Sequence, residues 1–256
     1  MKYFLEHNDK KYSNIDLIEA FKKLGIKKGD ILCVHTELFN FGTPLLPRNE
    51  FLQTILDCFF EVIGKEGTLI MPTFTYSFCK NEVYDKLNSP TKMGALNEYF
   101  RKQAGVKRTN DPIFSFAIKG TKEELFLKDT TSCFGENCVY DVLTQEGGKL
   151  INFGNTESFT YIHYPEEIVQ ISYRYNKTFE GFIIDENNKK YLKKINFFVR
   201  KDGIFPSDKK VRNFFIETKN YQKIPFAKGY IVYINTKKLY NECIKAFIKN
   251  NKIFLQ

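Results

Sequence analysis

The sequence predicts an α/β fold, a three-layer sandwich with a largely parallel or mixed central sheet and an insertion that contains a β-hairpin. Over residues 1–155, short segments that are continuously apolar alternate with longer amphipathic segments. A short apolar run is typical of a strand buried on both faces, and such strands joined by helices form parallel sheets. Residues 178–199 differ, because two strand-like runs flank a polar turn there. No repeat or linker interrupts the chain, so we expect a single domain over residues 1–256, with 178–199 as the insertion.

Apolar spacing and glycine stops predict the elements of the alternating region. The first helix starts at Ser13 or Asn14, either of which can cap it, and ends at Gly25. A second helix over 49–63 carries its apolar side chains on one face and ends at Gly64. The same signals predict strands at "DILCVHT", "GTLIMPT", "IFSFAIKG" and "KLINFG", and helices at 93–103 and "VYDVLTQEGG".

The insertion and the segment after it contain further elements. "FEGFIID" and "YLKKINFFV" flank the polar "ENNKK", which predicts a hairpin. We then expect a helix near 207–219, a strand at "GYIVYIN" and a last helix over 236–250.

Composition argues against several classes of protein. The 256 residues are 43% hydrophobic and 16% aromatic, which is enough to bury a core. The start "MKYFLEHNDKKYSN" has no apolar signal region, and no run approaches the roughly 18 apolar residues of a membrane span. We therefore expect a cytoplasmic protein. The net charge of +9 comes from lysines spread along the chain, which argues against a nucleic-acid partner and is compatible with a ligand that carries phosphates.

Cysteines and histidines form no metal-binding pattern. The six cysteines include no C-x-x-C pair, and His7, His35 and His163 are far apart. We expect buried reduced thiols and no metal. The motifs G-x-S-x-G, G-x-x-x-x-G-K-[ST], G-x-G-x-x-G and H-E-x-x-H are absent, so the usual hydrolases, NTPases and dehydrogenases have no local support.

Polar side chains follow three of the predicted strands. These segments are His35-Thr36-Glu37, Thr73-Phe74-Thr75-Tyr76 and Gly154-Asn155-Thr156. Ligands of open α/β sheets bind beyond the carboxyl ends of the strands. If the three strands are parallel neighbours, the three loops lie at one edge, and His35 and His163 can face one cleft.

The segment "TYIHYPEE", residues 160–167, permits two interpretations. His163 and Glu166 are three residues apart and share one helical face, so the carboxylate can orient the imidazole as a base. In the other interpretation, a surface helix starts at His163 and both glutamates are solvated. Helical spacing suits Glu166 and Glu167 equally as the partner.

Five segments occur in the order and spacing of one known family. They are "KKGDILCVHTELFNFG", "GTLIMPTFTYSF", "MGALNEYFRKQAGVKRTNDPIFSFAIKG", "FGENCVYDVLTQEGGKLINFG", and "TYIHYPEE" followed by "YRYNKTF". Together they resemble the aminoglycoside 3-N-acetyltransferase family over roughly residues 10–240. The resemblance implies an α/β fold particular to that family and transfer of an acetyl group from acetyl-CoA to an amine.

Two segments depart from the pattern of that family. Its H-S-S-L is His35-Thr36-Glu37-Leu38 here, and its R-S-x-H-P is Arg108-Thr109-Asn110-Asp111-Pro112. Both changes fall where ligand contacts are expected, so they bear on the acceptor rather than on the acyl transfer.

The resemblance also implies roles for individual residues. The H-x-x-E pattern makes His163 the general base and Glu166 its partner. The coenzyme is expected to contact His35, Thr36, Thr73, Thr75, Arg108 and Ser115, and the acceptor to contact Glu37, Tyr76 and Asp111. Each also has a structural interpretation, such as a buried histidine for His35 or a surface loop arginine for Arg108. Acyl transfer through Cys133 or Cys138 is the alternative to direct attack, although small buried thiols fit these cysteines better.

Three functions follow from these observations. "PTFTYSF" and "KRTNDPIFS" resemble relatives that acylate amino sugars, so the main hypothesis is an acetyl-CoA-dependent N-acetyltransferase for an amino sugar, nucleotide-linked, in bacterial surface-polysaccharide biosynthesis. The second is an aminoglycoside 3-N-acetyltransferase that inactivates antibiotics. The third is an α/β module that binds CoA or a nucleotide without turnover. Formation of a homo-oligomer stays open.

Overall fold

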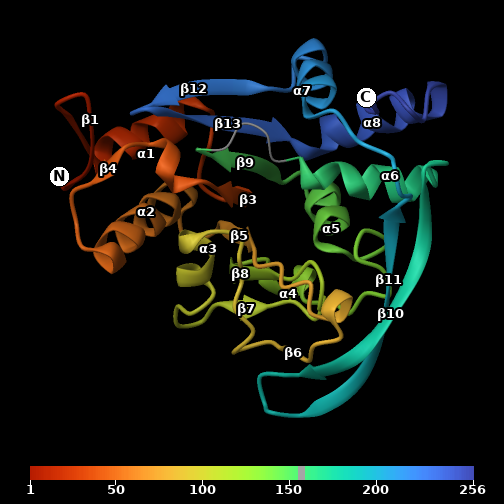
Figure 1. The fold of residues 1–256 in the computed structure, drawn as a ribbon. Helices are drawn as coiled ribbons and strands as arrows, with labels where there is room; N and C mark the ends of the chain where they lie inside the picture. The colour runs from red at the N-terminus through yellow and green to blue at the C-terminus, as the bar shows by residue number, and fades with distance from the viewer. Residues whose placement is uncertain (155–158) are drawn as a thin grey trace.

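The computed structural model describes residues 1–154 and 159–256, and a seven-stranded mixed sheet forms its centre (Figure 1). In spatial order its strands are β12 (Gln222–Phe226), β13 (Gly229–Asn235), β9 (Lys149–Phe153), β3 (Ile31–Thr36), β5 (Thr68–Pro72), β8 (Phe116–Gly120) and β7 (Lys107–Arg108). The pairs β9–β3 and β3–β5 are parallel, and all the outer pairs are antiparallel. The parallel part is thus confined to the three central strands.

Helices cover both faces of this sheet, which confirms the predicted three-layer α/β fold. Side chains of a strand alternate between its faces. On β3, Leu32 and Val34 belong to one apolar cluster, whereas Ile31 and Cys33 belong to another. The first cluster includes residues of α1 (Asn14–Lys23), α2 (Arg48–Ile63) and α3 (Ala95–Phe100), and the second includes residues of α5 (Val139–Gln145), α6 (His163–Val169), α7 (Asp208–Glu217) and α8 (Thr236–Lys249). Because both faces are covered, the central strands are continuously apolar.

Local signals place the helix ends close to their predicted positions. Ser13, rather than Asn14, caps α1 and forms a capping box with Asp16. Gly64 follows α2 with a φ of 67°, a left-handed value that favours glycine. Helix α3 is shorter than the predicted 93–103.

The predicted hairpin is present and is longer than expected. Strands β10 (Arg174–Ile184) and β11 (Lys190–Arg200) pair in antiparallel register over their full length, and β6 (Tyr84–Asp85) adds in parallel to β10. Figure 1 shows this hairpin curving along one side of the molecule, with one end beside α6. The base of the hairpin therefore lies next to the helix that begins at His163.

Several short elements have no counterpart in the sequence-based prediction. An N-terminal hairpin forms because Asn8 and Asp9 both adopt positive φ, as a two-residue turn requires. The strand β12 lies at the edge of the large sheet, and its buried and exposed side chains do not alternate regularly. The remaining elements are β1 (Tyr3–His7), β2 (Lys10–Ser13), β4 (Thr43–Pro44), α4 (Glu123–Phe126), and the 3₁₀ turns η1 (Leu38–Asn40), η2 (Phe78–Lys80) and η3 (Thr160–Ile162).

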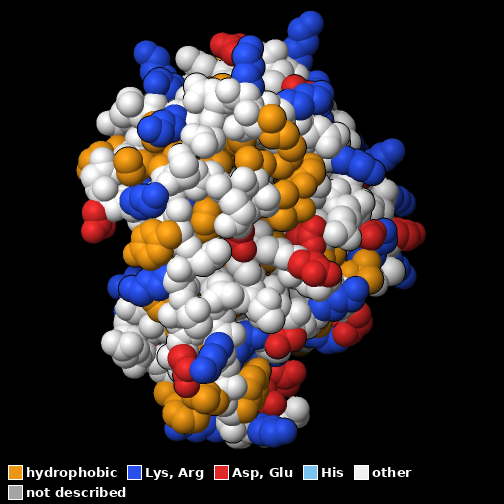
Figure 2. Space-filling model, turned by 90° about the vertical axis from the view of Figure 1, so that its right-hand side faces the viewer, with side chains coloured by type: hydrophobic (Ala, Val, Ile, Leu, Met, Phe, Trp, Pro, Cys, Tyr) orange, Lys and Arg blue, Asp and Glu red, His pale blue; other side chains and the backbone are white. Residues whose placement is uncertain are grey.

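The positive charge is dispersed over the surface, as the spread of lysines along the sequence predicts. On the face that Figure 2 shows, lysine and arginine side chains are scattered and interspersed with acidic ones. Within the described ranges, no helix combines the length and apolarity that a membrane crossing needs. Five of the six cysteines are buried free thiols, whereas Cys79 is exposed.

Candidate active site

The carboxyl ends of three central strands meet at one edge of the sheet, as the sequence predicted. Strands β9, β3 and β5 are parallel neighbours, so the segments after them lie side by side. His35 is near the end of β3, Thr73 follows β5, and Gly154 follows β9. Asn155 and Thr156, which were predicted to belong to this edge, lie outside the described residues.

His163 is the first residue of α6, directly after the 3₁₀ turn η3. Pro165 is tolerated two residues later because N–H groups in the first helical turn have no acceptor within the helix. Gln170 ends the helix in a left-handed conformation. The short helix therefore carries His163 and Glu166 on adjacent turns of one face.

Glu166 is the carboxylate that contacts His163. The imidazole Nδ1 lies 2.8 Å from Glu166 Oε2, and Glu166 is 3% exposed. The hydroxyl of Tyr173 donates to Glu166 Oε1 at 2.6 Å. Arg174 Nε lies 2.8 Å from Oε2 in an ion pair whose N–H is not aligned as a hydrogen bond. Burial raises the pKa of Glu166, but contacts with His163 and Arg174 outweigh burial and hold that pKa below its usual value.

Glu167 points to different partners. Its Oε1 accepts a hydrogen bond from the hydroxyl of Ser132, and burial raises its pKa. Ser132 precedes the loop that carries Phe134, so Glu167 holds that loop against α6. The choice that helical spacing left open is therefore made by tertiary contacts.

Nδ1 of His163 has a second neighbour, because Arg174 Nη2 also lies 2.8 Å away. A ring nitrogen can donate to the carboxylate or accept from the guanidinium, but it cannot do both, so the two contacts belong to different tautomers. With the proton on Nδ1, the ring donates to Glu166 and Nε2 keeps its lone pair. A general base needs this tautomer.

His163 opens on a cavity of about 500 Å³. Its side chain is 27% exposed, and its ring packs in a T-shape with that of Phe134, with ring centres 5.2 Å apart. Burial and the charge of Arg174 lower the pKa of His163, although Glu166 opposes them. The neutral imidazole therefore prevails near pH 7. The other residues that line this cavity are Tyr76, Phe114, Thr160, Arg174, Phe197, Arg200, Lys201, Asp202, Gly203, Ile204 and Phe205.

His35 lines a different and larger cavity, of about 960 Å³. His35 is 4% exposed, its Nε2 lies 3.1 Å from the hydroxyl of Tyr140, and burial lowers its pKa to about 4. Thr36 and Glu37 line the same cavity, and the hydroxyl of Thr36 donates to Asn97. The rest of the lining comes from Leu38, Phe39, Gly42, Pro44, Leu46, Arg48, Phe51, Leu52, Lys92, Met93, Gly94 and Ala95.

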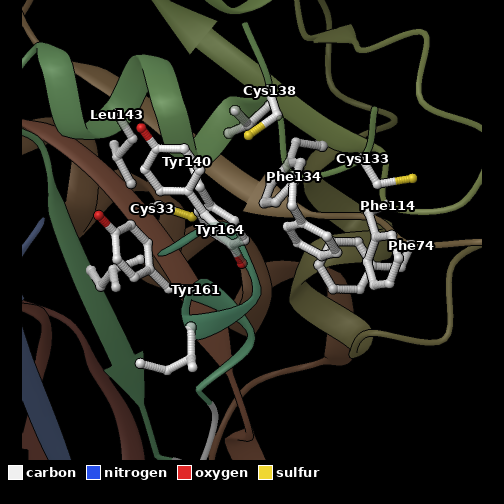
Figure 3. Packing of buried hydrophobic residues seen from close by; sticks show 14 of the residues in the cluster. Cys33, Phe74, Phe114, Cys133, Phe134, Cys138, Tyr140, Leu143, Tyr161 and Tyr164 are labelled. Atoms are coloured by element: carbon white, nitrogen blue, oxygen red, sulfur yellow. The ribbon is translucent and has the colours of Figure 1, made fainter. Parts of the chain in front are cut away.

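Aromatic side chains separate the two histidines. The rings of Phe134 and Tyr140 are stacked with centres 6.1 Å apart, and they touch His163 and His35 respectively. Figure 3 shows both rings within the buried cluster. The two histidines thus lie at the same edge of the sheet but line separate cavities.

Four residues expected to bind the coenzyme are buried, and Thr73, Arg108 and Ser115 share one hydrogen-bond network. Arg108 donates to the carbonyl of Thr73 at 2.7 Å and to the Thr73 hydroxyl at 3.1 Å, and Ser115 donates to the same carbonyl at 2.6 Å. Another Arg108 nitrogen donates to the carbonyl of Ser89 at 2.7 Å. The hydroxyl of Thr75 donates to the carbonyl of Pro112. The structure places these four residues near one another, but none of them lines either cavity. Their hydrogen bonds stabilise the loop after β5.

The three residues expected to bind the acceptor are in three different places. Tyr76 shares the smaller cavity with His163, whereas Glu37 is exposed at the larger one. Asp111 is 5% exposed, and its Oδ1 accepts from the backbone N–H groups of Ile113 and Phe114, both at 2.8 Å. Asp111 therefore shapes a turn, and neither cavity includes its side chain.

Sequence reasoning did not assign roles to Tyr173 and Arg174, although the "YRYNKTF" segment contains both. Their contacts with Glu166 depend on the hairpin reaching α6, which no local pattern reveals. In the part of the chain that the structure describes, no cluster of His, Cys, Asp and Glu could hold a metal ion.

A sequence model described as aminoglycoside 3-N-acetyltransferase matches residues 33–247 of the chain. The chain belongs to the aminoglycoside 3-N-acetyltransferase family. A curated relative, the SPbeta prophage-derived aminoglycoside N(3')-acetyltransferase-like protein YokD of Bacillus subtilis (strain 168), is 26% identical over 157 residues, 53% of this chain and 56% of that protein. Aminoglycoside N(3)-acetyltransferase III of Salmonella sp is 22% identical over 198 residues, 68% of this chain and 66% of that protein. The chain thus matches less than two thirds of the length of each.

Solved structures of family members have the same fold. AAC-VIa bound to sisomicin superposes with a TM-score of 0.80 at 17% identity, covering 92% of this chain and 97% of that one. The binary complex of AAC-IIIb with CoASH gives a TM-score of 0.79 at 18% identity, covering 93% and 97%. Structural similarity at sequence identities of 17% and 18% establishes the fold alone.

The main functional hypothesis from the sequence was wrong in its acceptor. A nucleotide-linked amino sugar of surface-polysaccharide biosynthesis was expected, whereas the family and the named relatives are aminoglycoside N-acetyltransferases. The short segments used for that subgroup are a poor guide because their residues, such as Thr75 and Arg108, are occupied with supporting a loop.

Proposed function

We propose that the protein transfers an acetyl group from acetyl-CoA to an amine of an aminoglycoside, with His163 as the general base. The observation that carries this proposal is the His163–Glu166 pair, which opens on the smaller cavity in a chain of this family. The complexes of family members with CoASH and with sisomicin support the choice of donor and acceptor class.

The reaction needs a base because an ammonium group is not a nucleophile. In the proposed step, Nε2 of His163 takes a proton from the acceptor amine, and the nitrogen attacks the thioester carbonyl carbon. The carbon–sulfur bond then breaks, the thiolate leaves and is protonated, and an amide remains. Glu166 stabilises the imidazolium that forms in between.

The larger cavity is the proposed site of the coenzyme. It lies at the same edge of the sheet as His163, since His35 and Thr36 end β3 and both line it. Arg48 and Lys92 also line it, and their charges suit the phosphates of the donor. The apolar side chains around them, including Met93 and Leu52, suit its pantetheine arm. The smaller cavity then receives the acceptor, and the proposal requires the amine and the thioester to meet at the sheet edge beside which both cavities lie.

Replacing His163 tests the proposal. The variant His163→Asn should release CoA thiol about 100-fold more slowly or worse with acetyl-CoA and sisomicin, because positioned base catalysis contributes about 10²–10⁴-fold. The matched control is His7→Asn, which changes a histidine on β1 that lines neither cavity. A folded His163→Asn protein with the turnover of the wild type would refute the base assignment. Coenzyme binding by calorimetry without thiol release across a panel of amines would instead indicate a binding module.

A further inference from the structure

Arg174 lies against both members of the proposed catalytic pair. It is the first residue of β10 and its side chain is 4% exposed. Its Nε is 2.8 Å from Glu166 Oε2, its Nη2 is 2.8 Å from His163 Nδ1, and its Nη1 donates to the carbonyl of Phe198 on β11 at 3.0 Å. The hairpin thus fixes the guanidinium at the point where imidazole and carboxylate meet.

A buried histidine–carboxylate pair has an intrinsic difficulty as a base. The negative charge of a carboxylate favours the protonated imidazole, and an imidazolium has no lone pair with which to accept a proton. Burial of the imidazole opposes this effect of the carboxylate, and a positively charged third group opposes it further. A fixed positive charge beside the carboxylate does this, because it satisfies the anion and repels a proton from the ring.

The charged and titratable groups around His163 identify that third group. Helix α6 supplies Glu166, while Glu167 is turned toward Ser132. The segment that enters β10 supplies the Tyr173 hydroxyl, which binds the other oxygen of Glu166. The end of β11 and the residues after it place Arg200, Lys201 and Asp202 in the lining of the same cavity, and the loop after β5 adds Tyr76. Among these described groups, Arg174 is a cation within 2.8 Å of both the imidazole and the carboxylate.

We propose that Arg174 is a positioning residue that, by pairing with Glu166, holds His163 in the neutral form that can accept a proton. This inference rests on the proposed role of His163 as the base. The role acts through the pair, because Nε of Arg174 forms an ion pair with Glu166 and Nη1 is anchored to the carbonyl of Phe198. In the tautomer that serves as the base, Nδ1 donates to Glu166, so the nearby Nη2 acts on the ring through its charge and not as a hydrogen-bond donor. During proton transfer, the imidazolium can strengthen its contact with Glu166 while the guanidinium stays anchored to β11.

Imidazole NMR of the resting protein tests the proposal without any turnover. The chain has three histidines, so the His163 signals can be assigned by comparison with His163→Asn. In the wild type, the midpoint of the His163 titration should lie below the ordinary value of 6.5. In Arg174→Gln it should move to higher pH, and in Arg174→Lys, which keeps a positive charge, it should move less. A wild-type midpoint above 6.5 would overturn the proposal even if no Arg174 variant folds.

The pH dependence of turnover provides the second measurement. For Arg174→Gln, kcat/KM at about pH 6 should fall about tenfold or more and recover toward the wild-type value above about pH 8. Lys190→Gln is the control, because Lys190 begins β11 at the opposite end of the hairpin and its removal should leave the profile unchanged. A loss of equal size at every pH, with an unshifted His163 titration, would mean that Arg174 only supports the fold. If the NMR shift appears but no acceptor is turned over, the proposed function fails and the assignment of Arg174 stands.

Discussion

Single residues in this protein owe their chemistry to their partners rather than to their type. His35 and His163 are both histidines at the same edge of the sheet, and burial lowers the pKa of each. His35 meets the hydroxyl of Tyr140, whereas His163 meets a carboxylate and a guanidinium. His163 therefore has charged neighbours that can stabilise an imidazolium formed during a reaction.

The buried His35 makes stability depend on pH. Its pKa is about 4 in the folded protein and about 6.5 in the unfolded chain, so the unfolded state binds the proton more readily. The stabilising contribution is full above pH 6.5 and is lost as the pH falls toward 4, amounting to about 3 kcal/mol. Denaturant unfolding of the wild type and His35→Gln between these values should show a shallower pH slope for the variant. Equal slopes would contradict this account.

At the scale of elements, the β10–β11 hairpin decides what surrounds the proposed catalytic pair, His163 and Glu166. It brings Arg174 to Glu166, and its far strand ends at Arg200, which lines the smaller cavity with Lys201. The sequence predicted the hairpin from its polar turn but not its contact with α6, because strand patterns specify which faces are buried and not the element that buries them. Helical spacing suited Glu166 and Glu167 equally as partners of His163, and the H-x-x-E pattern of the family predicted Glu166.

The cations at the end of β11 should disfavour acceptors with many positive charges. Arg200 lines the smaller cavity, which is the proposed acceptor site, and like charges repel across a site that is partly shielded from water. Arg200→Gln should therefore raise kcat/KM for a polycationic aminoglycoside severalfold at low ionic strength, and the difference should shrink as salt is added. The measurement should be made at a pH at which His163 is neutral in both the wild type and Arg200→Gln, with Lys190→Gln as the control. An unchanged or lowered kcat/KM would show that Arg200 does not face the bound acceptor.

At the scale of the whole molecule, two apolar clusters join the layers on either side of the sheet. Helix α8 belongs to one of them and contacts both α5 and α6, so the C-terminal helix supports the helix that carries His163. The parallel order of β9, β3 and β5 then brings segments more than 100 residues apart to one edge. Such an arrangement makes the site depend on global packing.

Truncating a core residue of α8 tests that dependence. Phe247 is 1% exposed and its ring meets Phe254 with centres 5.2 Å apart. Phe247→Ala should lower the free energy of unfolding by about 3–5 kcal/mol, because it removes buried apolar surface and leaves a cavity. The adjacent Ile248 is 74% exposed, and Ile248→Ala should change stability by less than about 0.5 kcal/mol in denaturant unfolding. Similar losses for both variants would mean that α8 is not packed as described.

The sequence by itself determined the layers, most of the helices and central strands, the hairpin, the family blocks and the spacing of His163 and Glu166. These features are carried by local periodicity, turn residues and motif order, which act over a few residues. Only the tertiary structure decided that Glu166 rather than Glu167 meets His163, that Arg174 joins them, that Arg108 serves a buried loop, and that the two histidines line separate cavities. The physical reason is that these outcomes depend on which elements pack together. Elements distant in sequence supply the charged side chains beside His163 and the residues that line the cavities.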